Sequence, residues 1–221
     1  MESFFCTVGM VPEPQFSNCT MFLTKTIKLV TILDDVYGTV DELELWDVNI
    51  LNDLPDYMKS CFLALYNTVN EIASDILKEQ GEVVLPYLTN AWADLLKAFL
   101  QEAKWSYQEQ TPKFEEYLEN AWMSVSGPLQ LIHAYFLLGH GRAKEELECL
   151  EKYHNLLRWP SVIFRLCNDI ASFKSAREHM NKLIDEAWKK MNREGFEGCG
   201  FDEVFIATAL NIARLSHCLY Q

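Results

Sequence analysis

The sequence lacks the clusters of basic residues that nucleic-acid-binding proteins usually carry. Asp and Glu number 32 against 19 Lys and Arg, which gives a formal net charge of −13. The densest basic positions, Lys189–Lys190 and Arg142–Lys144, are both predicted to lie on helix surfaces. We therefore expect no nucleic-acid partner. An anionic substrate would need local cations or metal ions to overcome the overall repulsion.

Long apolar runs are missing as well. No stretch reaches the ~18 apolar residues that a membrane-spanning helix needs. The first residues, MESFFCTVGMVPEPQF, match neither a signal peptide nor a transit peptide. They resemble a helix end that runs into a proline-containing loop, which suggests a truncated chain. As it stands, the chain is expected to be intracellular and cytoplasmic with no membrane span, or plastidic if a transit peptide is missing.

Paired cysteines and paired histidines are absent too. The seven cysteines are scattered and odd in number, with no C-x-x-C pair, which predicts reduced thiols that are mostly buried. The five histidines show no H-E-x-x-H spacing, so we interpret them as structural or surface residues. The sequence therefore offers neither a disulfide framework nor a histidine-based metal site.

Alternating strand patterns bounded by turn signals are scarce, whereas helical periodicity covers nearly the whole chain. Apolar residues make up 49% of the sequence, enough for a shared core. We predict one all-α domain of nine or ten helices. The predicted ranges are 16–36, 56–79, 86–108, 112–125, an apolar segment after a break at Gly127–Pro128, 143–156, 160–175, 176–193 and 202–219.

Two adjacent carboxylates, Asp34 and Asp35, end the apolar helical run in LVTILDDVYGTVDELELW. Taken alone, such a pair is ordinarily a solvated surface feature. The surrounding segments change that reading. VPEPQFSNC, LPYLTNAWADLLKAFLQEAKW, SGPLQLIHAYF, RLCNDIASFKSA and LIDEAWKKMN all resemble plant class I terpene synthases, and they keep the order of that family.

The resemblance is strongest to the monoterpene and isoprene synthase branch. It implies that residues 1–221 are an incomplete C-terminal metal-binding domain, without the N-terminal helical domain, folded as a single helical bundle of the class I terpenoid synthase type. It also implies a lyase that ionises a prenyl diphosphate, expected to be geranyl diphosphate, to a monoterpene and pyrophosphate. The implied cofactor is Mg²⁺, with Mn²⁺ as a possible substitute. The product and the oligomeric state stay open.

The first metal motif of the family is D-D-x-x-D. Asp34 and Asp35 match its first two positions, but the position of the third Asp holds Gly38. A deletion of three residues before Val36 is the simplest account of this difference. Asp41 lies on the same helical face as Asp34, but seven residues rise ~10 Å, too far to replace the missing ligand.

The second motif is N/D-D-x-x-S/T-x-x-x-E. Asn168, Asp169 and Ser172 match it, whereas the Glu position holds Ala176. By resemblance, Asn168 and Ser172 are metal ligands or their supports. Arg165, three residues before Asn168, matches the arginine that contacts the diphosphate and is expected to share the face of the motif. A stretch usual in the family is missing where this chain joins Lys174 to Ser175.

Two other positions bear on the expected pocket. Cys6 stands where relatives place a pocket tryptophan, and Tyr220 matches a pocket tyrosine. The chain stops just before the acidic loop that closes the pocket in the family, and an open pocket admits water. Together with the missing carboxylates, this predicts very low or no activity.

Two hypotheses follow. The chain is either a Mg²⁺-dependent terpene synthase domain or a catalytically inactive helical protein derived from one, by gene decay or faulty exon joining. A chain-elongating prenyl enzyme of the same fold is a weaker third reading. Such enzymes carry two aspartate-rich motifs, and NDIAS is of the other kind.

Overall fold

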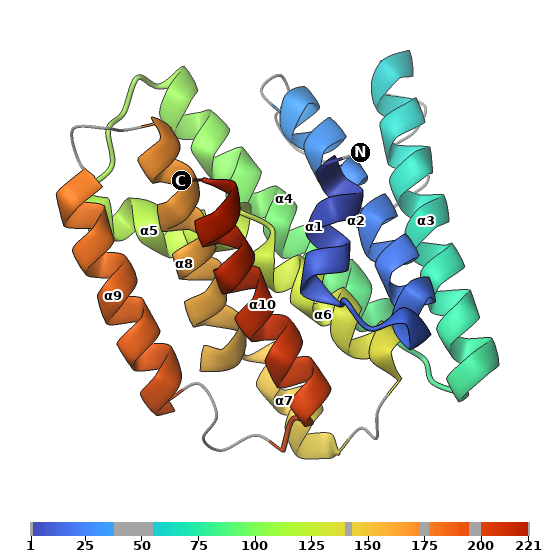
Figure 1. Ribbon diagram of the computed structural model, residues 1–221. Helices are drawn as coiled ribbons and strands as arrows, with labels where there is room; N and C mark the ends of the chain where they lie inside the picture. Colours follow the sequence, from blue (N-terminus) through green and yellow to red (C-terminus); the bar gives the residue numbers. More distant parts are fainter. Residues whose placement is uncertain (1, 38–54, 140–142, 173–176, 195–199, 221) are drawn as a thin grey trace.

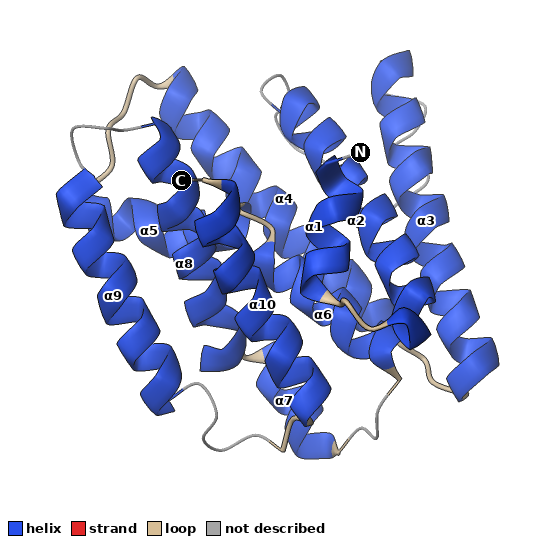
Figure 2. Ribbon diagram, in the orientation of Figure 1, coloured by secondary structure: helices blue, strands red, loops and turns tan. Residues whose placement is uncertain are grey.

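The computed structural model describes residues 2–37, 55–139, 143–172, 177–194 and 200–220. All regular elements in these residues are helical, and none is a strand (Figure 2). In chain order the elements are α1 (Glu2–Met10), the 3-10 helix η1 (Pro14–Phe16), α2 (Ser17–Tyr37), α3 (Asp56–Gln80), α4 (Leu85–Tyr107), α5 (Phe114–Ser124), α6 (Gly127–Leu138), α7 (Lys144–Glu151), α8 (Asn155–Ser172), α9 (Arg177–Glu194) and α10 (Glu203–Leu219). The predicted all-α fold is confirmed.

Several helix boundaries follow from residues that start or stop helices. α3 begins after Pro55 and ends at Gly81, whose left-handed φ of 74° suits a residue without a Cβ. The N–H of Gly81 donates to the carbonyl of Leu77 at 3.0 Å. At the start of α10, the Asp202 carboxylate accepts the N–H of Phe205 at 2.8 Å. The sequence therefore placed the ends of α3 and α10 within one residue.

The boundary between α7 and α8 differs from the prediction. The sequence predicts one helix over 143–156 and another that starts near Pro160. In the structure α7 already ends at Glu151, and α8 already begins at Asn155. Tyr153 adopts a left-handed φ of 50°, which interrupts α7. The carbonyl of His154 then accepts the N–H of Leu157 at 2.7 Å and begins α8. Pro160 consequently lies inside α8, where it cannot donate a backbone hydrogen bond.

Five helices form a closed ring of neighbours. α1 packs against α2 and α10, α10 also packs against α8, and α6 packs against both α2 and α8. α3 and α9 lie at opposite edges of the bundle, against α2 and α8 respectively (Figure 1). The last turns of α2, α4, α8 and α10 all lie at the upper end of the view in Figure 1. This end of the bundle therefore gathers four helix C-termini.

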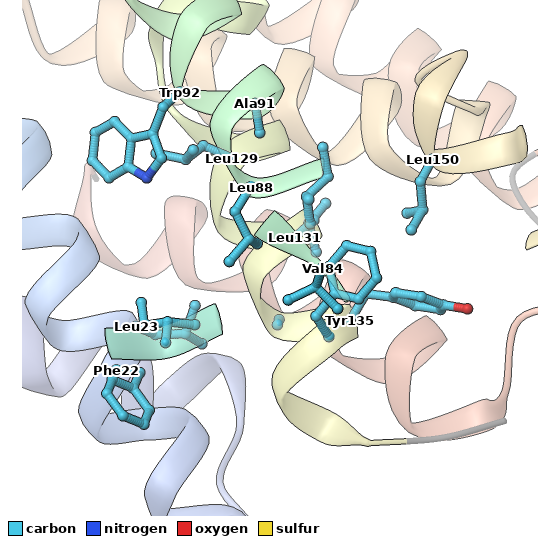
Figure 3. Close-up of a cluster of buried hydrophobic side chains, with 14 of the residues drawn as sticks. Phe22, Leu23, Val84, Leu88, Ala91, Trp92, Leu129, Leu131, Tyr135 and Leu150 are labelled. Carbon is cyan, nitrogen blue, oxygen red and sulfur yellow. The ribbon is translucent and has the colours of Figure 1, made fainter. Parts of the chain in front are cut away.

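The core is centred on α6, in which all residues but Leu137 are buried. Its Leu129 and Tyr135 belong to a cluster that also contains Leu23 of α2 and Trp92 of α4 (Figure 3). Phe205 of α10 is part of the same cluster. A second buried cluster joins α8 to α9. Because α6 contacts both α2 and α8, the packing around it determines how far apart these two helices stand.

The break predicted at Gly127–Pro128 is present. α5 ends at Ser124, and Ser126 adopts a left-handed φ of 66° before α6 begins. Gly127 has a packing role. A Cβ added there would lie 2.4 Å from Oγ and 3.1 Å from Cα of Ser161, so α6 and α8 approach each other closely at this point.

Five cysteines in the described residues are free thiols, as predicted, but only Cys19 and Cys167 are buried, so the expectation that the thiols are mostly buried is wrong. Burial raises the pKa of Cys19 and of Cys167 to about 12, which keeps both protonated near neutral pH. Cys149, however, is disulfide-bonded, so the expectation of seven reduced thiols is wrong for this residue. Sequence spacing alone does not show which cysteines lie within bonding distance. None of the helices in the described ranges has the length and hydrophobicity needed to cross a bilayer.

Candidate metal and diphosphate site

The two helices with the predicted metal ligands end at the same end of the molecule. Asp34 lies in the last turn of α2, and Asn168 lies near the end of α8. Both helices run upward in Figure 1 and finish at the upper end of the bundle. Since both pack against α6, they flank a common partner. The structure therefore brings the first and second motifs to one end of the bundle.

The described donors are oxygen atoms of the kind that Mg²⁺ prefers. Asp34 is exposed, and Asn168 is half-buried. The amide nitrogen of Asn168 donates to the Tyr220 hydroxyl at 3.4 Å, which leaves the amide oxygen as the atom that could ligate a metal. The negative ends of the helix dipoles also favour a cation here. The side chains of Asp35 and Ser172, the other two predicted ligands, lie outside the described part of the structure.

In the part of the chain that the structure describes, no group of three or more His, Cys, Asp or Glu side chains is placed to hold a metal ion. Asp34 and Asn168 fit Mg²⁺ by chemical type, but two protein oxygens cannot fill its octahedral shell. A complete shell would need phosphate oxygens, water, or the undescribed side chains of Asp35 and Ser172.

Tyr220, the predicted pocket tyrosine, follows the last residue of α10 and faces α8. Its ring is tilted against that of Phe164, with 6.2 Å between the ring centroids. Burial raises the pKa of the Tyr220 hydroxyl, and the nearby Cys6 adds to the effect. Tyr220 also borders a cavity of about 210 Å³ between α8, α9 and α10, together with Arg177. Cys6 of α1 is therefore close enough to Tyr220 to affect its ionisation, although Cys6 does not line this cavity.

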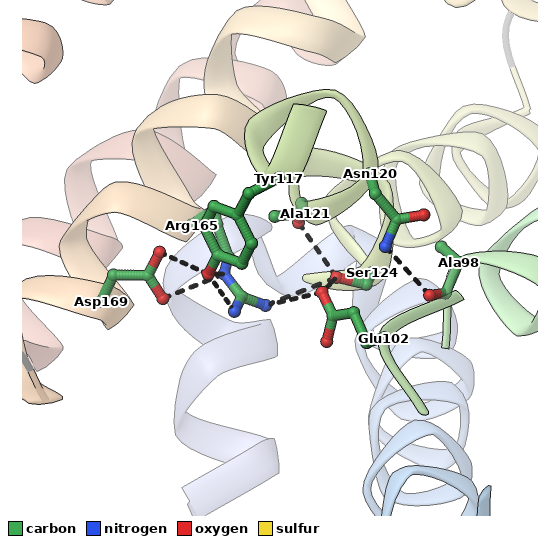
Figure 4. A network of polar contacts seen from close by, with 8 residues as sticks. All are labelled: Ala98, Glu102, Tyr117, Asn120, Ala121, Ser124, Arg165 and Asp169. Carbon is green, nitrogen blue, oxygen red and sulfur yellow. Dashed lines mark hydrogen bonds and ion pairs between the residues drawn. The ribbon is translucent and has the colours of Figure 1, made fainter. Parts of the chain in front are cut away.

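Arg165 forms the centre of a polar network between α4, α5 and α8 (Figure 4). Its Nε lies 3.0 Å from Oδ1 of Asp169 and donates to the Tyr117 hydroxyl at 2.8 Å. Its Nη2 also donates to that hydroxyl, and the hydroxyl itself donates to Oδ2 of Asp169 at 2.7 Å. Its Nη1 lies 3.5 Å from Oε1 of Glu102 and 3.4 Å from Oγ of Ser124. Three helices thus hold one guanidinium group.

The charges of this network stabilise the ionised arginine. Burial alone would lower the pKa of Arg165, but the carboxylates of Asp169 and Glu102 outweigh burial and raise it. Burial is also the main reason why the pKa of Tyr117 is raised, so its hydroxyl keeps its proton. The network therefore contains one positive and two negative groups around a neutral phenol.

Arg165 and Asn168 have different neighbours in the structure. Arg165 contacts Asp169 of the motif and also faces α4 and α5, whereas Asn168 contacts Tyr220 beyond the end of α10. Positions three apart on a helix differ in direction by about 60°, enough to give the two side chains different neighbours. That both side chains bind one ligand remains a prediction.

Sequence reasoning foresaw no contact with Arg165 for four members of the network, namely Glu102, Tyr117, Ser124 and Asp169. Only Asp169 carried a signal, because it stands inside the second motif. The other three lie 41 to 63 positions before Arg165 and show no motif of their own. Their role follows only from the packing of α4 and α5 near α8 (Figure 4).

A larger cavity lies elsewhere in the molecule. It measures about 370 Å³ and is lined by residues of α4, α6 and the α7 region, including Tyr87, Asp94 and Glu151. Tyr153, also in its wall, donates to Oδ2 of Asp94 at 2.8 Å. The lining contains none of the predicted site residues, so the predicted chemistry does not use this cavity.

The helical bundle and the paired oxygen donors at one of its ends are those of a class I terpenoid synthase domain. The family model described as "Terpene synthase family, metal binding domain" matches residues 1–192, and the chain belongs to this family. The chain is 53% identical to the chloroplastic isoprene synthase of Populus tremuloides and 46% identical to the (-)-alpha-terpineol synthase of Vitis vinifera. Each comparison covers 100% of this chain but only 43% of the relative.

Solved structures show the same relationship. Isoprene synthase from grey poplar, in complex with three Mg²⁺ ions and dimethylallyl-S-thiolodiphosphate, superposes with a TM-score of 0.93 at 50% identity, covering 100% of this chain and 48% of that one. Limonene synthase with 2-fluorolinalyl diphosphate gives a TM-score of 0.91 at 35% identity, covering 99% of this chain and 47% of that one. The chain thus spans about half the length of these relatives.

The alignments also bear on the predicted deletions. The alignment with the isoprene synthase of Populus tremuloides, an aspen, is 255 positions long, whereas this chain has only 221 residues to fill them. The relative therefore has residues inside the aligned region that this chain lacks. Their location after Asp35 and between Lys174 and Ser175 remains a prediction, because residues 38–54 and 173–176 lie outside the described structure.

Proposed function

We propose that residues 1–221 form the catalytic domain of a Mg²⁺-dependent terpene synthase and that this domain acts on geranyl diphosphate. The observation that carries the proposal is the position of Asp34 and Asn168 at one end of the bundle, on two helices that both pack against α6. The family match and the superposition on a relative solved with Mg²⁺ and a diphosphate analogue support it. The chloroplastic relatives support a plastid location for the protein.

The proposed roles follow from the chemistry of each side chain. Asp34 and Asn168, together with Asp35 and Ser172, hold Mg²⁺, or Mn²⁺ in its place. When bound, the metal supplies positive charge that stabilises the departing pyrophosphate. Arg165 contacts the diphosphate through its guanidinium donors.

The reaction needs one bond to break and one proton to leave. The C–O bond of the substrate breaks, and both electrons leave with pyrophosphate. The allylic cation then loses a proton and gives a monoterpene. Tyr220 and Phe164 present aromatic rings next to Asn168, and each ring stabilises a nearby cation by roughly 0.5–2 kcal/mol.

A five-carbon substrate is a second candidate. The aspen relative at 53% identity is an isoprene synthase, whereas the grapevine terpineol synthase is 46% identical. The grey poplar enzyme was solved with a dimethylallyl diphosphate analogue. Dimethylallyl diphosphate therefore belongs in the same assay as geranyl diphosphate.

An inactive protein is the remaining candidate, and a specific observation favours it. The last carboxylate of each motif is replaced, by Gly38 and by Ala176, and the alignment shows that the aspen relative has residues absent here. Loss of a ligand weakens metal binding. Coding sequence for such residues in the genomic DNA at codons 35 or 174 would identify the chain as a product of faulty exon joining.

The test is an assay of the purified chain with each diphosphate, with and without Mg²⁺, that measures volatile products and released pyrophosphate. A terpene synthase gives both in a Mg²⁺-dependent manner, at a low rate because of the altered motifs. A folded helical chain that releases no pyrophosphate above the metal-only control would contradict the proposal and favour the inactive protein.

A matched pair of insertions sharpens this assay. Ala-Ala-Asp inserted between Asp35 and Val36 restores a carboxylate four residues after Asp34, and Ala-Ala-Asn is the control of equal length. We expect higher turnover with the first insertion than with the second. Equal turnover would show that the missing carboxylate does not limit this chain.

A further inference from the structure

The two carboxylates that contact Arg165 are held very differently. The Asp169 side chain is 5% exposed, lies 3.0 Å from Nε and accepts the Tyr117 hydroxyl at 2.7 Å. The Glu102 side chain is 30% exposed and lies 3.5 Å from Nη1, beyond the length of a charge-assisted hydrogen bond. Asp169 is therefore a fixed partner of the arginine, and Glu102 is a replaceable one.

The guanidinium group has two edges with separate partners. Nε and Nη2 both donate to the Tyr117 hydroxyl, on the side of Asp169. Nη1 faces Glu102 and Ser124 on the other side (Figure 4). Because the guanidinium is planar and its donors are rigidly spaced, holding the first edge also fixes the direction of the second. The Nη1 edge is thus the one on which a partner can change without reorienting the arginine.

The charges point to such a change of partner. Arg165 with Asp169 and Glu102 carries a net charge of −1 in a partly buried place, which repels a further anion. We infer that Glu102 occupies the Nη1 edge as an internal substitute for the diphosphate and is displaced from it when the diphosphate binds. This inference rests on the proposed function, which assigns the diphosphate to Arg165.

Ser124 links the two states. Its hydroxyl now donates to Oε1 of Glu102 at 2.5 Å, next to Nη1 of Arg165. Once Glu102 leaves, both the Ser124 hydroxyl and Nη1 of Arg165 can donate to a phosphate oxygen. Displacement therefore exchanges one oxygen acceptor for another and leaves neither donor without a partner.

The test is isothermal titration calorimetry with inorganic pyrophosphate at fixed Mg²⁺ on the wild-type chain, Glu102→Gln and Glu116→Gln. Glu116 is exposed in the first turn of α5, so its variant loses the same formal charge without touching Arg165. We expect Glu102→Gln to bind pyrophosphate about fivefold more tightly than the wild type, the ratio that corresponds to one partly exposed ion pair. Glu116→Gln should stay close to the wild type.

If Glu102→Gln binds no more tightly than Glu116→Gln, the inference is wrong while the proposed function stands. If none of the three chains binds pyrophosphate with Mg²⁺, the proposed function fails as well. A crystal structure of the wild-type chain with Mg²⁺ and pyrophosphate gives an answer that does not depend on any variant. A phosphate oxygen on Nη1 in place of Glu102 supports the inference, and Glu102 still in contact with Nη1 overturns it.

Discussion

The ends of α8 and α2, which carry the second and first motifs, differ in what surrounds them. Near the end of α8, Asp169 is buried and joined to Arg165 and Tyr117, and α5, α9 and α10 all pack against this helix. In the last turn of α2, Asp34 is exposed to solvent. One half of the candidate site is therefore buried among packed helices, whereas the described aspartate of the other half is exposed to solvent.

The largest difference between the two regions should appear in the free energy of unfolding when Asp169 or Asp34 is replaced by alanine. Asp169→Ala leaves Arg165 without its buried partner and should lower the free energy of unfolding by about 3–5 kcal/mol. Asp34→Ala changes an exposed residue and should lower it by about 0.5 kcal/mol or less. Urea denaturation followed by circular dichroism measures both. Equal losses would show that the two ends are held alike.

A fall in pH should lower the folding stability of the protein through α6, the helix that packs against both α2 and α8. His133 of α6 is completely buried, and burial lowers its pKa from 6.5 to about 4. Between these values the unfolded chain binds a proton that the folded chain does not, so stability falls as the pH falls. The total loss from this residue is about 3 kcal/mol, from the size of the shift.

The measurement is the free energy of unfolding at several pH values between 6.5 and 4. His133→Gln should show a shallower decline than the wild type, because it removes the titrating group. His179→Gln removes an exposed histidine and serves as the control. A His133→Gln chain as acid-sensitive as the control would refute the assignment.

The Tyr117 hydroxyl gives a smaller expected effect within the α8 network. Tyr117→Phe takes one hydrogen-bond partner from Arg165 and one from Asp169, and we expect a loss of about 2 kcal/mol in unfolding free energy. Tyr107→Phe is the matched control, because Tyr107 is 92% exposed. Thermal denaturation of both variants distinguishes them, and equal melting temperatures would show that the network does not stabilise the end of α8.

The exposed ion pair between α2 and α3 should contribute least to the free energy of unfolding. Lys25 of α2 and Glu71 of α3 lie 2.8 Å apart, with side chains 40% and 49% exposed. A double-mutant cycle with alanine should give a coupling of about 0.2–1 kcal/mol that shrinks in 1 M salt. A larger, salt-resistant coupling would mean that α2 is held more firmly than its exposure indicates.

The helical scaffold could be predicted because its signals are local. Apolar residues at helical spacing, with Pro55 and Gly81 at the two ends of α3, were enough to place this helix to within one residue. The turn before α8 escaped prediction because Tyr153 adopts a left-handed conformation without being Gly or Asn, the residues that usually signal it.

The candidate site could be predicted only in part. Asp34 and Asn168 belong to recognisable motifs, and the structure places them at the same end of the bundle. Glu102 and Tyr117 belong to no motif, and their contact with Arg165 depends on how three helices meet. Such contacts are fixed by tertiary packing, which one sequence does not reveal.

The close contact between Gly127 and Ser161 means that the glycine affects the position of residues far from it. The gap between α6 and α8 is as narrow as it is because position 127 has no side chain. Even one methyl group there would act as a wedge and tilt α8, and with it Asn168 some two turns further along. The geometry of the candidate site is therefore set partly by a residue that never touches a ligand.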